Sequence, residues 1–349
     1  METPPSQRAK RKDEHLEAVL GDPLSASAET RGTHFDDIYL IPNCLPELAL
    51  RDIDLSTTVA GLALAKPVVI NAMTGGTPKG LETNRALARA AASLGLAMAV
   101  GSQTIALEAP ETSPTFTVVR EENPSGIVFA NLPAGATPGA ARRAVDALQA
   151  DALQLHLNAA QELAMPEGDR DFRGRLAAIQ QVCRSLDRPV IVKEVGSGIA
   201  REQARMLREA GVAAIDVGGA GGTDFRDVEQ RRAGTIPGRH RWGLPTAITL
   251  IEVSGSGLGV VAGGGIRTGL DAVKAFALGA SAVSIAAPLV RSFRSGGQQA
   301  LEDYLERLLA DIRETLLLSG AGCVGQAASV PLVFSGLVRD WVTARQLNR

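Results

Sequence analysis

The run Ala152-Leu153-Gln154-Leu155-His156-Leu157-Asn158 is mostly apolar and ends in polar side chains. A short apolar run of this kind is typical of a strand buried in a parallel sheet. Alternation along the strand sends His156 and Asn158 to the same side, while Gln161 and Glu162 fall in the turn that follows. For any one of these residues, local hydrogen bonds at a strand end are the simpler interpretation. Together, an imidazole, two amides and a carboxylate favour a site for one polar ligand or one metal ion.

Seven further apolar runs occur along the chain, and stretches with helical spacing separate most of them. Strands alternating with helices predict βαβ units and a parallel sheet. Eight such units favour closure of the sheet, so we predict an α/β fold of the (β/α)8 TIM-barrel class. The eight runs are residues 67–72, 96–101, 126–131, 152–158, 189–195, 212–218, 258–263 and 280–286, and the clearest helical stretches are 81–94, 173–186, 202–210 and 270–278.

The composition narrows the class of protein. A net charge of −2 over 349 residues gives no overall field for nucleic acid or an anionic membrane. No uninterrupted apolar stretch is long enough to span a bilayer. Cys44, Cys183 and Cys323 lack metal-site spacing and are interpreted as reduced thiols. We therefore predict a soluble cytoplasmic protein without nucleic-acid or membrane partners.

Two segments interrupt the regular alternation. Residues 1–30 are polar and rich in basic side chains, and they are interpreted as a flexible basic arm. The remaining residues, 31–349, are predicted to form one barrel domain with a long loop insertion at about 219–243. This insertion is polar and glycine-rich, so we expect it to supply a mobile active-site loop. Residues 301–318 are predicted to form a final amphipathic helix.

Glycine-rich segments follow three of the predicted strands, at residues 73–77, 218–223 and 263–267. In a barrel of this class, the loops at the carboxyl ends of the strands build the site. Glycine lets backbone N–H groups approach a ligand closely, and a helix N-terminus there often holds a phosphate. Any one of these segments is equally well an ordinary tight turn. Three at the same end of the barrel predict a phosphate-bearing ligand.

A lysine lies in an otherwise apolar run at the same rim. Lys193 could simply pair with Glu194 or with another carboxylate. Beside a flavin ring, a buried cation would instead stabilise the anionic reduced form. Asn131 and the Ser102-Gln103 pair add neutral hydrogen-bonding groups, although each alone could be a turn residue. Their common location suits a planar heterocycle over the barrel mouth.

Eight segments spread over nearly the whole chain resemble those of the type 2 isopentenyl-diphosphate isomerases. The most specific are the basic pair Arg11-Lys12 combined with 156–158 and 161–162. The resemblance implies an FMN-dependent barrel in isoprenoid biosynthesis that interconverts isopentenyl diphosphate and dimethylallyl diphosphate by flavin-assisted proton transfer. It also implies Mg²⁺ on the diphosphate, NADPH as the reductant of FMN, a basic arm folded over the active site, and a homo-oligomer that is a tetramer or larger. The segments are 11–15, 72–76, 101–103, 156–158 with 161–162, 192–194, 222–223 with 229, 242–243 and 264–267.

The resemblance assigns residues to the site. Glu162 is implied as a Mg²⁺ ligand, and we assign Gln161 and Glu229 to the second proton site or its relay. The residues implied to contact FMN are Met73, Thr74, Gly75, Ser102, Asn131, Lys193, Thr223, Gly264, Gly265, Ala286 and Ala287. Those implied to lie near the substrate are Arg11, Lys12, His15, Ser102, Gln103, Thr104, His156, Asn158 and Gln161.

One position departs from the family pattern. Members commonly carry arginine after the Ser-Gln pair, whereas this chain carries Thr104, which brings no charge. Either another cation compensates, with Arg8, Lys10 and Arg31 as the candidates, or the substrate is bound more weakly.

Three other functions compete with isomerisation. A flavin oxidoreductase of the 2-hydroxy-acid oxidase type would need a histidine base late in the barrel, and the only histidine after residue 156 is His240, inside the long insertion. A purine-nucleotide dehydrogenase would need a reactive cysteine in the loop after the sixth strand, and no cysteine lies there. A non-catalytic FMN- or phosphate-binding barrel is the third, and Thr104 gives it limited support.

Overall fold

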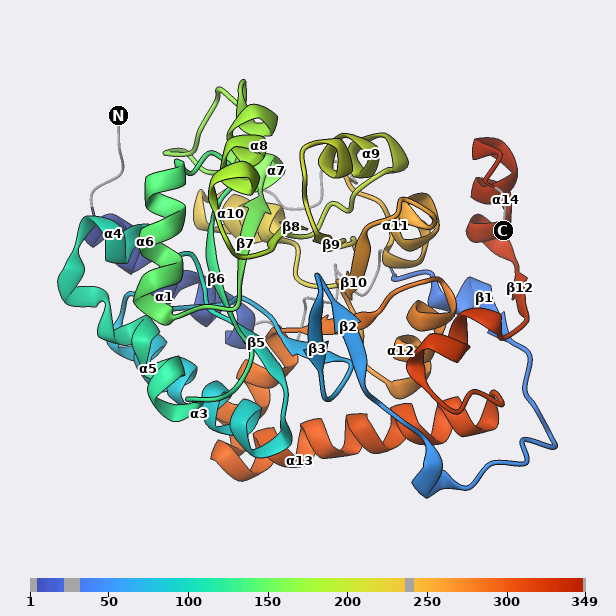
Figure 1. The fold of residues 1–349 in the computed structure, drawn as a ribbon. Coiled ribbons are helices and arrows are strands. Elements are labelled where there is room, and N and C mark those ends of the chain that lie inside the picture. The colour runs from blue at the N-terminus through green and yellow to red at the C-terminus, as the bar shows by residue number, and fades with distance from the viewer. Residues whose placement is uncertain (1–4, 22–31, 236–241, 348–349) are drawn as a thin grey trace.

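The computed structural model describes residues 5–21, 32–235 and 242–347. Its centre is a closed barrel of eight strands, in the order β10-β11-β4-β5-β6-β7-β8-β9, and every neighbouring pair is parallel (Figure 1). Each predicted apolar run overlaps one of these strands, so the (β/α)8 prediction is confirmed. The strands are β4 (Val68–Ile70), β5 (Ala97–Ala99), β6 (Val128–Pro133), β7 (Ala152–Leu157), β8 (Val190–Glu194), β9 (Ala214–Asp216), β10 (Gly259–Gly263) and β11 (Ala282–Ile285).

A two-stranded hairpin closes the amino end of the barrel. It consists of β2 (Thr57–Val59) and β3 (Leu62–Leu64), and its Val59 and Leu64 join the small apolar cluster inside the barrel. The Thr57 hydroxyl donates to the carbonyl of Ser281, 2.8 Å away and just before β11. Because this end is filled, a ligand site is confined to the carboxyl ends of the strands.

Helices cover the outside of the barrel, and a continuous apolar core lies between them and the strands. Two of these helices begin after a threonine cap: Thr77 and Thr137 accept hydrogen bonds from backbone N–H groups, and each precedes a proline. The helices are α3 (Pro78–Leu94), α4 (Thr104–Glu108), α5 (Pro114–Glu122), α6 (Pro138–Leu148), α7 (Ala159–Ala164), α8 (Arg175–Ser185), α9 (Arg201–Glu209), α10 (Phe225–Arg232), α11 (Thr246–Val253), α12 (Gly269–Ala277), α13 (Ala287–Leu318) and α14 (Gly336–Arg345).

The C-terminal part of the chain differs from the prediction. The predicted helix over 301–318 is the second half of α13, whose backbone leaves the helical region at Gly296 and Gly297. It is not the final helix, because α14 follows it. Between them β12 (Leu332–Phe334) pairs antiparallel with β1 (Ile38–Leu40), which lies almost 300 residues earlier in the chain. Short 3-10 helices complete the fold: η1 (Phe35–Asp37), η2 (Leu50–Asp52), η3 (Pro110–Thr112) and η4 (Val324–Ser329).

The connection between β9 and β10 contains two helices, α10 and α11. The segment predicted as a loop at about 219–243 is therefore in part helical. Residues 236–241 of this insertion, including His240, lie outside the described residues, and its mobility stays a prediction. Among the described residues, no helix combines the length and apolar character that crossing a membrane requires.

The basic arm contains a helix, α1 (Pro5–Gly21), which contacts α3, α4 and α13 (Figure 1). Leu16 anchors it, with only 2% of its surface exposed. The expected flexibility of the arm stays a prediction. The helix brings its cationic residues to the carboxyl end of the barrel, where the pocket lies.

Candidate active site at the carboxyl ends of the strands

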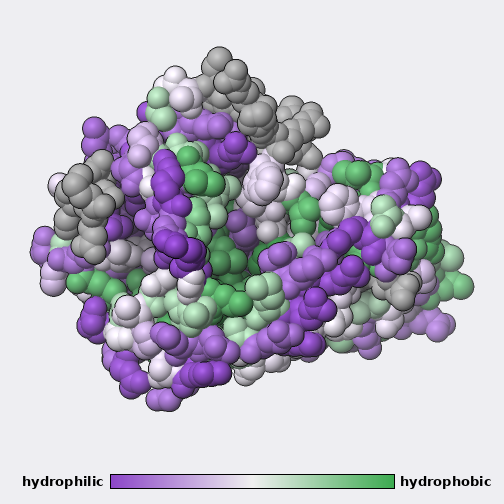
Figure 2. Space-filling model, turned by 90° about the horizontal axis from the view of Figure 1, so that it is seen from above, coloured by the Kyte–Doolittle hydropathy of each residue, from purple (hydrophilic) through white to green (hydrophobic). Residues whose placement is uncertain are grey.

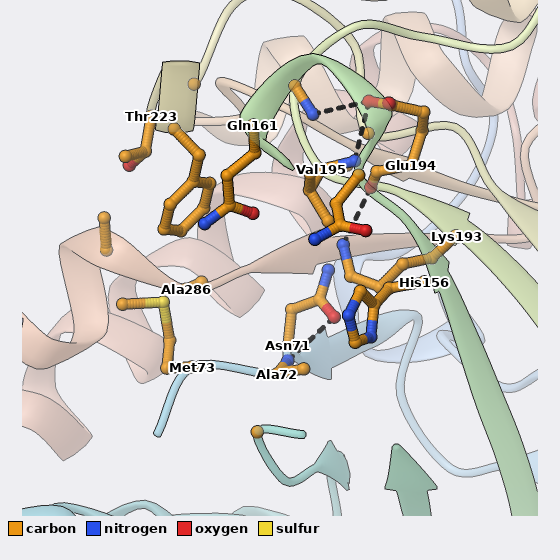
Figure 3. A pocket seen from close by; sticks show the side chains of 18 of the residues that line it. Asn71, Ala72, Met73, His156, Gln161, Lys193, Glu194, Val195, Thr223 and Ala286 are labelled. Atoms are coloured by element: carbon orange, nitrogen blue, oxygen red, sulfur yellow. Dashed lines mark hydrogen bonds between the residues drawn. The ribbon is translucent and has the colours of Figure 1, made fainter. Parts of the chain in front are cut away.

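A pocket opens at the carboxyl end of the barrel, and every barrel strand contributes a residue to it at or near its end. Figure 2 shows the molecule from above, with apolar side chains in a central hollow and hydrophilic ones around it. Figure 3 shows how side chains from different strands converge on the pocket. The four polar residues expected to converge at the end of the run 152–158 and just after it all line this pocket: His156, Asn158, Gln161 and Glu162.

A buried polar network lies under the pocket. Asp216 of β9 is fully buried, and its Oδ2 accepts hydrogen bonds from Asn71 Nδ2 at 2.7 Å and from Ser284 Oγ at 3.0 Å. The same oxygen lies 3.9 Å from Lys193 Nζ, which donates to the carbonyl of Glu194 at 3.0 Å. The network therefore holds the Lys193 ammonium at the pocket floor, beside His156 on the next strand (Figure 3).

His156 is neutral and held in one orientation. Burial, together with the nearby charges of Lys193 and Lys12, lowers the pKa of His156 to about 3. Its Nδ1 lies 2.9 Å from Asn131 Oδ1, and Asn131 in turn donates from Nδ2 to Gln154 Oε1 at 3.2 Å. An amide oxygen only accepts, so Nδ1 of the neutral ring carries the proton and Nε2 has a free lone pair.

Glu194 shapes the loop after β8. One of its carboxylate oxygens accepts from the backbone N–H groups of Val195, Gly196 and Ser197, at 2.7 Å and 2.8 Å for the first two. Burial raises the pKa of Glu194 to about 7, although these hydrogen bonds oppose the shift. The carboxylate thus fixes the loop at the pocket edge rather than pairing with Lys193.

Glycines let two strand ends pack backbone to backbone. Gly264 and Gly265 have φ of +104° and +94°, which side chains rarely adopt. A Cβ on Gly264 would lie 2.2 Å from the carbonyl oxygen of Gly219, and one on Gly265 would lie 2.2 Å from that of Gly221. Near this segment, α13 begins after Ala286 without a side-chain cap, which leaves the N–H of Ala287 available to a ligand, whereas Pro288 has no N–H and Leu289 N donates to Ala286 O at 3.0 Å. The arrangement can hold an anionic group against bare backbone.

Helix α1 contributes basic side chains to the lining of the pocket. Arg8, Arg11, Lys12 and His15 all line the pocket. Lys12 Nζ donates to the carbonyl of Ser102 at 2.8 Å and lies 5.0 Å from the centre of the Phe116 ring. Burial, together with the charges of the neighbouring Arg11 and Arg8, lowers the pKa of Lys12 to about 7. An anionic ligand would be stabilised by this group of three cations.

A second cluster joins α1 to the barrel. Glu229 is fully buried, and its Oε1 accepts from His15 Nε2 at 2.5 Å and from Gln161 Nε2 at 3.1 Å. Burial alone raises the pKa of Glu229, but hydrogen bonds from His15, Gln161 and Arg232 lower it to about 2. Glu229 is therefore a carboxylate, and Gln161 stands between it and the pocket.

Most of the residues assigned from the sequence line this one pocket, and four do not. Gln103 turns away: its Nε2 donates to Ala144 O at 3.0 Å, and its Oε1 accepts from Asn131 N at 3.1 Å. Gly75 faces the Phe116 ring, Thr74 is buried beside it, and Glu229 lies behind Gln161. Those that line the pocket are Arg11, Lys12, His15, Met73, Ser102, Thr104, Asn131, His156, Asn158, Gln161, Glu162, Lys193, Thr223, Gly264, Gly265, Ala286 and Ala287.

Sequence reasoning missed the polar floor of the pocket. Asn71 and Ser284 line it and Asp216 supports them. Each is a polar residue inside one of the eight apolar runs, which is the same signal that singled out Lys193. It also missed Arg232, whose partners come from distant segments.

The chain is similar to known proteins in both sequence and fold. Residues 129–331 match the family model described as FMN-dependent dehydrogenase. A crystal structure of a mandelate oxidase variant has the same fold, with a TM-score of 0.67 and 23% identity over 96% of this chain and 100% of that one. Fold, pocket and family match thus define an FMN-dependent dehydrogenase-type barrel.

The relatives narrow the class. A curated isopentenyl-diphosphate delta-isomerase of Symbiobacterium thermophilum is 49% identical over 98% of this chain and 96% of its own length. One of Bacillus licheniformis is 46% identical over 98% of this chain and 97% of its own. The chain belongs to the isopentenyl-diphosphate delta-isomerase family.

Proposed function

We propose that the protein interconverts isopentenyl diphosphate and dimethylallyl diphosphate by proton transfer, with FMN as cofactor. The observation that carries this proposal is that two groups suited to anions line one pocket. A glycine-lined backbone cradle and the Lys193 ammonium lie on the barrel, and Arg8, Arg11 and Lys12 lie on α1. The pocket can accept a cofactor phosphate at the first and a substrate diphosphate at the second.

The residues on the barrel side fit FMN. A Cβ at Gly264 or Gly265 would clash with the backbone of Gly219 or Gly221 and distort the cradle that these segments form, and the N–H of Ala287 at the start of α13 is available to a phosphate. Asn71, Asn131 and Lys193 supply hydrogen-bonding groups for a polar heterocycle on the floor. When bound and reduced, FMN supplies an electron-rich ring that exchanges protons without net redox change. NADPH as the reductant of FMN stays a proposal that rests on the resemblance.

Gly264→Ala tests this cradle. We expect FMN affinity to fall at least tenfold and stability to fall by about 1–3 kcal/mol, because the new Cβ meets backbone at 2.2 Å and the φ is positive. Fluorescence titration of the apoprotein with FMN measures the first effect. Gly255→Ala is the control, because Gly255 also has a positive φ of +73° but has nothing within 4 Å of its Cβ position. Equal loss of FMN affinity in both variants would contradict the cradle.

The substrate end is assigned to α1 and α7. Lys and Arg donors suit diphosphate oxygens. Glu162 is the proposed Mg²⁺ ligand; its Oε1 accepts from Asn158 Nδ2 at 2.8 Å, and its Oε2 accepts from Asp169 N at 2.9 Å. Among the described residues, no cluster of three or more His, Cys, Asp or Glu side chains is placed to hold a metal. Mg²⁺ would therefore take most of its ligands from diphosphate oxygens and water, as this cation commonly does.

Moving the double bond requires a proton added at one carbon and one removed from another. Gln161 reaches the pocket, where its amide can orient the alkene or a water molecule. One N–H of its Nε2 donates to Glu229, and its carbonyl oxygen, as the acceptor of the amide, is the group that could face a developing positive charge. Glu229 acts through Gln161 and His15 in this scheme, which makes it a positioning residue.

The deciding experiment is anaerobic turnover in D₂O with FMN, NADPH, Mg²⁺ and isopentenyl diphosphate, followed by mass spectrometry. We expect deuterated dimethylallyl diphosphate without stoichiometric loss of NADPH. FMN-loaded protein that forms no product would overturn the proposal. Oxidation of a 2-hydroxy acid by the same protein would then support an oxidase, and inertness toward both would support a non-catalytic barrel.

The structure offers Arg8 as the cation that compensates for Thr104. Arg8 lines the pocket, as Thr104 does, and pairs with Glu108 at 3.1 Å. Lys10 points elsewhere, with 78% of its side chain exposed, and Arg31 lies outside the described residues. The Thr104 hydroxyl is 3.1 Å from that of Ser102, so it offers a hydrogen bond in place of a charge.

Arg8→Ala is expected to raise the KM for isopentenyl diphosphate about tenfold, because one charge-assisted contact to the diphosphate is lost. Adding Thr104→Arg to this variant is expected to restore most of the affinity. Steady-state kinetics of the two single variants and the double variant measure the coupling. Lys10→Ala is the matched control and should leave KM unchanged. A KM for Arg8→Ala equal to that of Lys10→Ala would remove Arg8 from the substrate site.

The homo-oligomer predicted from the sequence stays a proposal. It is supported by large exposed apolar side chains on β1, in the loop after β1, at the end of α13 and on β12: Tyr39, Leu45, Leu318 and Val333 are 59%, 77%, 61% and 51% exposed. Apolar surface gathered in this way is typical of an interface. A cytoplasmic location is likewise proposed, and the free thiols of Cys44, Cys183 and Cys323 are consistent with it.

A further inference from the structure

Arg232 holds three carboxylates from three separate parts of the chain. Its Nη1 lies 2.5 Å from Glu229 Oε2 on the same helix, α10. Its Nε lies 2.6 Å from Glu14 Oε2 on α1, and its Nη2 lies 2.7 Å from Glu167 Oε1, just after α7. Each of the three guanidinium nitrogens therefore has its own carboxylate partner. A planar guanidinium with directed N–H groups can satisfy this arrangement, and a lysine ammonium cannot.

This contact fixes the orientation of Glu229. Arg232 takes Oε2, which leaves Oε1 for His15 and Gln161. Neither Arg232 nor Glu229 lines the pocket, whereas His15 and Gln161 do. Arg232 can therefore influence the chemistry only through the groups that it orients.

The charges show why the cluster depends on one residue. Glu14, Glu167 and Glu229 are three carboxylates, and the positive groups facing them are Arg232, Arg11 near Glu167 and, when protonated, His15, with Lys10 reaching Glu14 at 3.8 Å from the solvent side. Arg232 is only 21% exposed and Glu229 is fully buried, so water screens their interaction weakly. Without Arg232, the docked α1 would place Glu14 near Glu167 and Glu229 with no cation that contacts all three carboxylates.

We propose that Arg232 is a positioning residue that couples the docking of α1 to the alignment of Glu229 and Gln161. The same guanidinium holds Glu14 of the arm and Glu229 of the proton-relay cluster, so loss of the arm contact loosens the carboxylate that orients Gln161. The catalytic part of this proposal rests on the proposed isomerase function. The structural part, the latching of α1, does not.

The test compares four variants of the full-length, FMN-loaded protein. Arg232→Gln removes the guanidinium and its charge, Arg232→Lys keeps the charge, and Glu14→Gln removes the charge of the arm contact together with that of the exposed Lys10 pair at 3.8 Å. Lys79→Gln is the matched control, because Lys79 also ties α1 to the barrel through Glu17 at 2.6 Å but in an exposed ion pair. Hydrogen–deuterium exchange of α1, measured without substrate, reports how firmly α1 is docked on the barrel. The values of kcat and KM and the acid limb of the kcat–pH profile report the alignment of Glu229 and Gln161.

For Glu14→Gln, we expect exchange in α1 to rise at least fivefold and KM to rise, with kcat within twofold of wild type. For Arg232→Gln, we expect the same rise in exchange, a fall in kcat of at least tenfold, and an acid limb moved to higher pH, because Glu229 loses its cationic partner. Arg232→Lys should recover part of kcat but not the protection of α1. Lys79→Gln should match wild type in every measurement.

Three results would overturn the proposal: wild-type exchange in α1 for Arg232→Gln, an unchanged kcat and acid limb for that variant, or equal loosening by Lys79→Gln and Glu14→Gln. Faster exchange of the barrel strands as well as of α1 would show general destabilisation and would also overturn it. A wild-type protein that is inactive toward isopentenyl diphosphate refutes the proposed function instead, and the exchange data then decide the latching by themselves.

Discussion

Lys193→Met is expected to lower isomerisation about 100- to 1,000-fold, which is the effect of removing one preorganised electrostatic group from an active site. Lys193 is 8% exposed and belongs to the pocket floor, where its ammonium lies 3.9 Å from Asp216 and donates to the Glu194 carbonyl. Methionine keeps the length of the side chain and removes the charge that would stabilise a reduced, anionic flavin. Turnover and the midpoint potential of bound FMN measure the loss, and the potential should become more negative.

Lys274→Met is the matched control for this variant. Lys274 is also 8% exposed, and its ammonium donates to the Phe35 carbonyl at 2.9 Å, away from the pocket. It should lose stability in a denaturant titration but keep wild-type turnover and flavin potential. If Lys193→Met left both the potential and turnover unchanged, the ammonium would have only a structural role beneath the pocket.

The barrel was predictable because its strands are buried on both faces. Residues 190–194, for example, are buried at every position, so the sequence there is a nearly continuous apolar run in which a lysine stands out. The same property made the site visible: strand-end residues such as His156 and Lys193 interrupt apolar runs, and parallel strands bring their ends to one rim. These predictions depended on local patterns that the fold repeats eight times.

One error was local, and the others occurred where contacts between distant segments decide the structure. Gln161 and Glu162 were expected in a turn, but Asn158 precedes a short helix, α7, built on good helix formers. Gln103 was expected in the pocket beside Ser102, yet its amide forms hydrogen bonds with the backbone of Ala144 and Asn131. No local sequence pattern predicts these two hydrogen bonds. The pairing of β1 with β12 and the partners of Arg232 are also contacts between remote segments.

Glu229→Gln is expected to lower turnover about 100-fold with FMN still bound. The reason is positional: Oε1 of Glu229 holds both Gln161 and His15, and a displacement of about 1 Å in an aligned group can cost that much rate. A glutamine at this position would present an N–H group to one of these donors or to Arg232, so at least one contact would be lost. Steady-state kinetics at saturating substrate measure the effect.

The same substitution has a pH-dependent effect on stability. Hydrogen bonds and charge from His15, Gln161 and Arg232 overcome burial and lower the pKa of Glu229 from 4.5 to about 2. A carboxylate with a lowered pKa stabilises the folded state above its unfolded pKa of 4.5, and this contribution is lost as the pH falls toward 2. The shift corresponds to something on the order of 3 kcal/mol. Urea unfolding should therefore show the largest difference between wild type and Glu229→Gln near neutral pH, and the difference should shrink below pH 4.5.

Glu252→Gln separates the two effects of this prediction. Glu252 is 1% exposed and holds Arg345 and Trp341 at 2.8 Å each, outside the pocket, and these contacts help to lower the pKa of Glu252 although burial opposes them. It should lose stability with the same pH trend but keep normal turnover. Loss of turnover in both variants would assign the effect of Glu229→Gln to general destabilisation, whereas loss in Glu229→Gln alone would show that the buried carboxylate acts on the reaction through the side chains it orients.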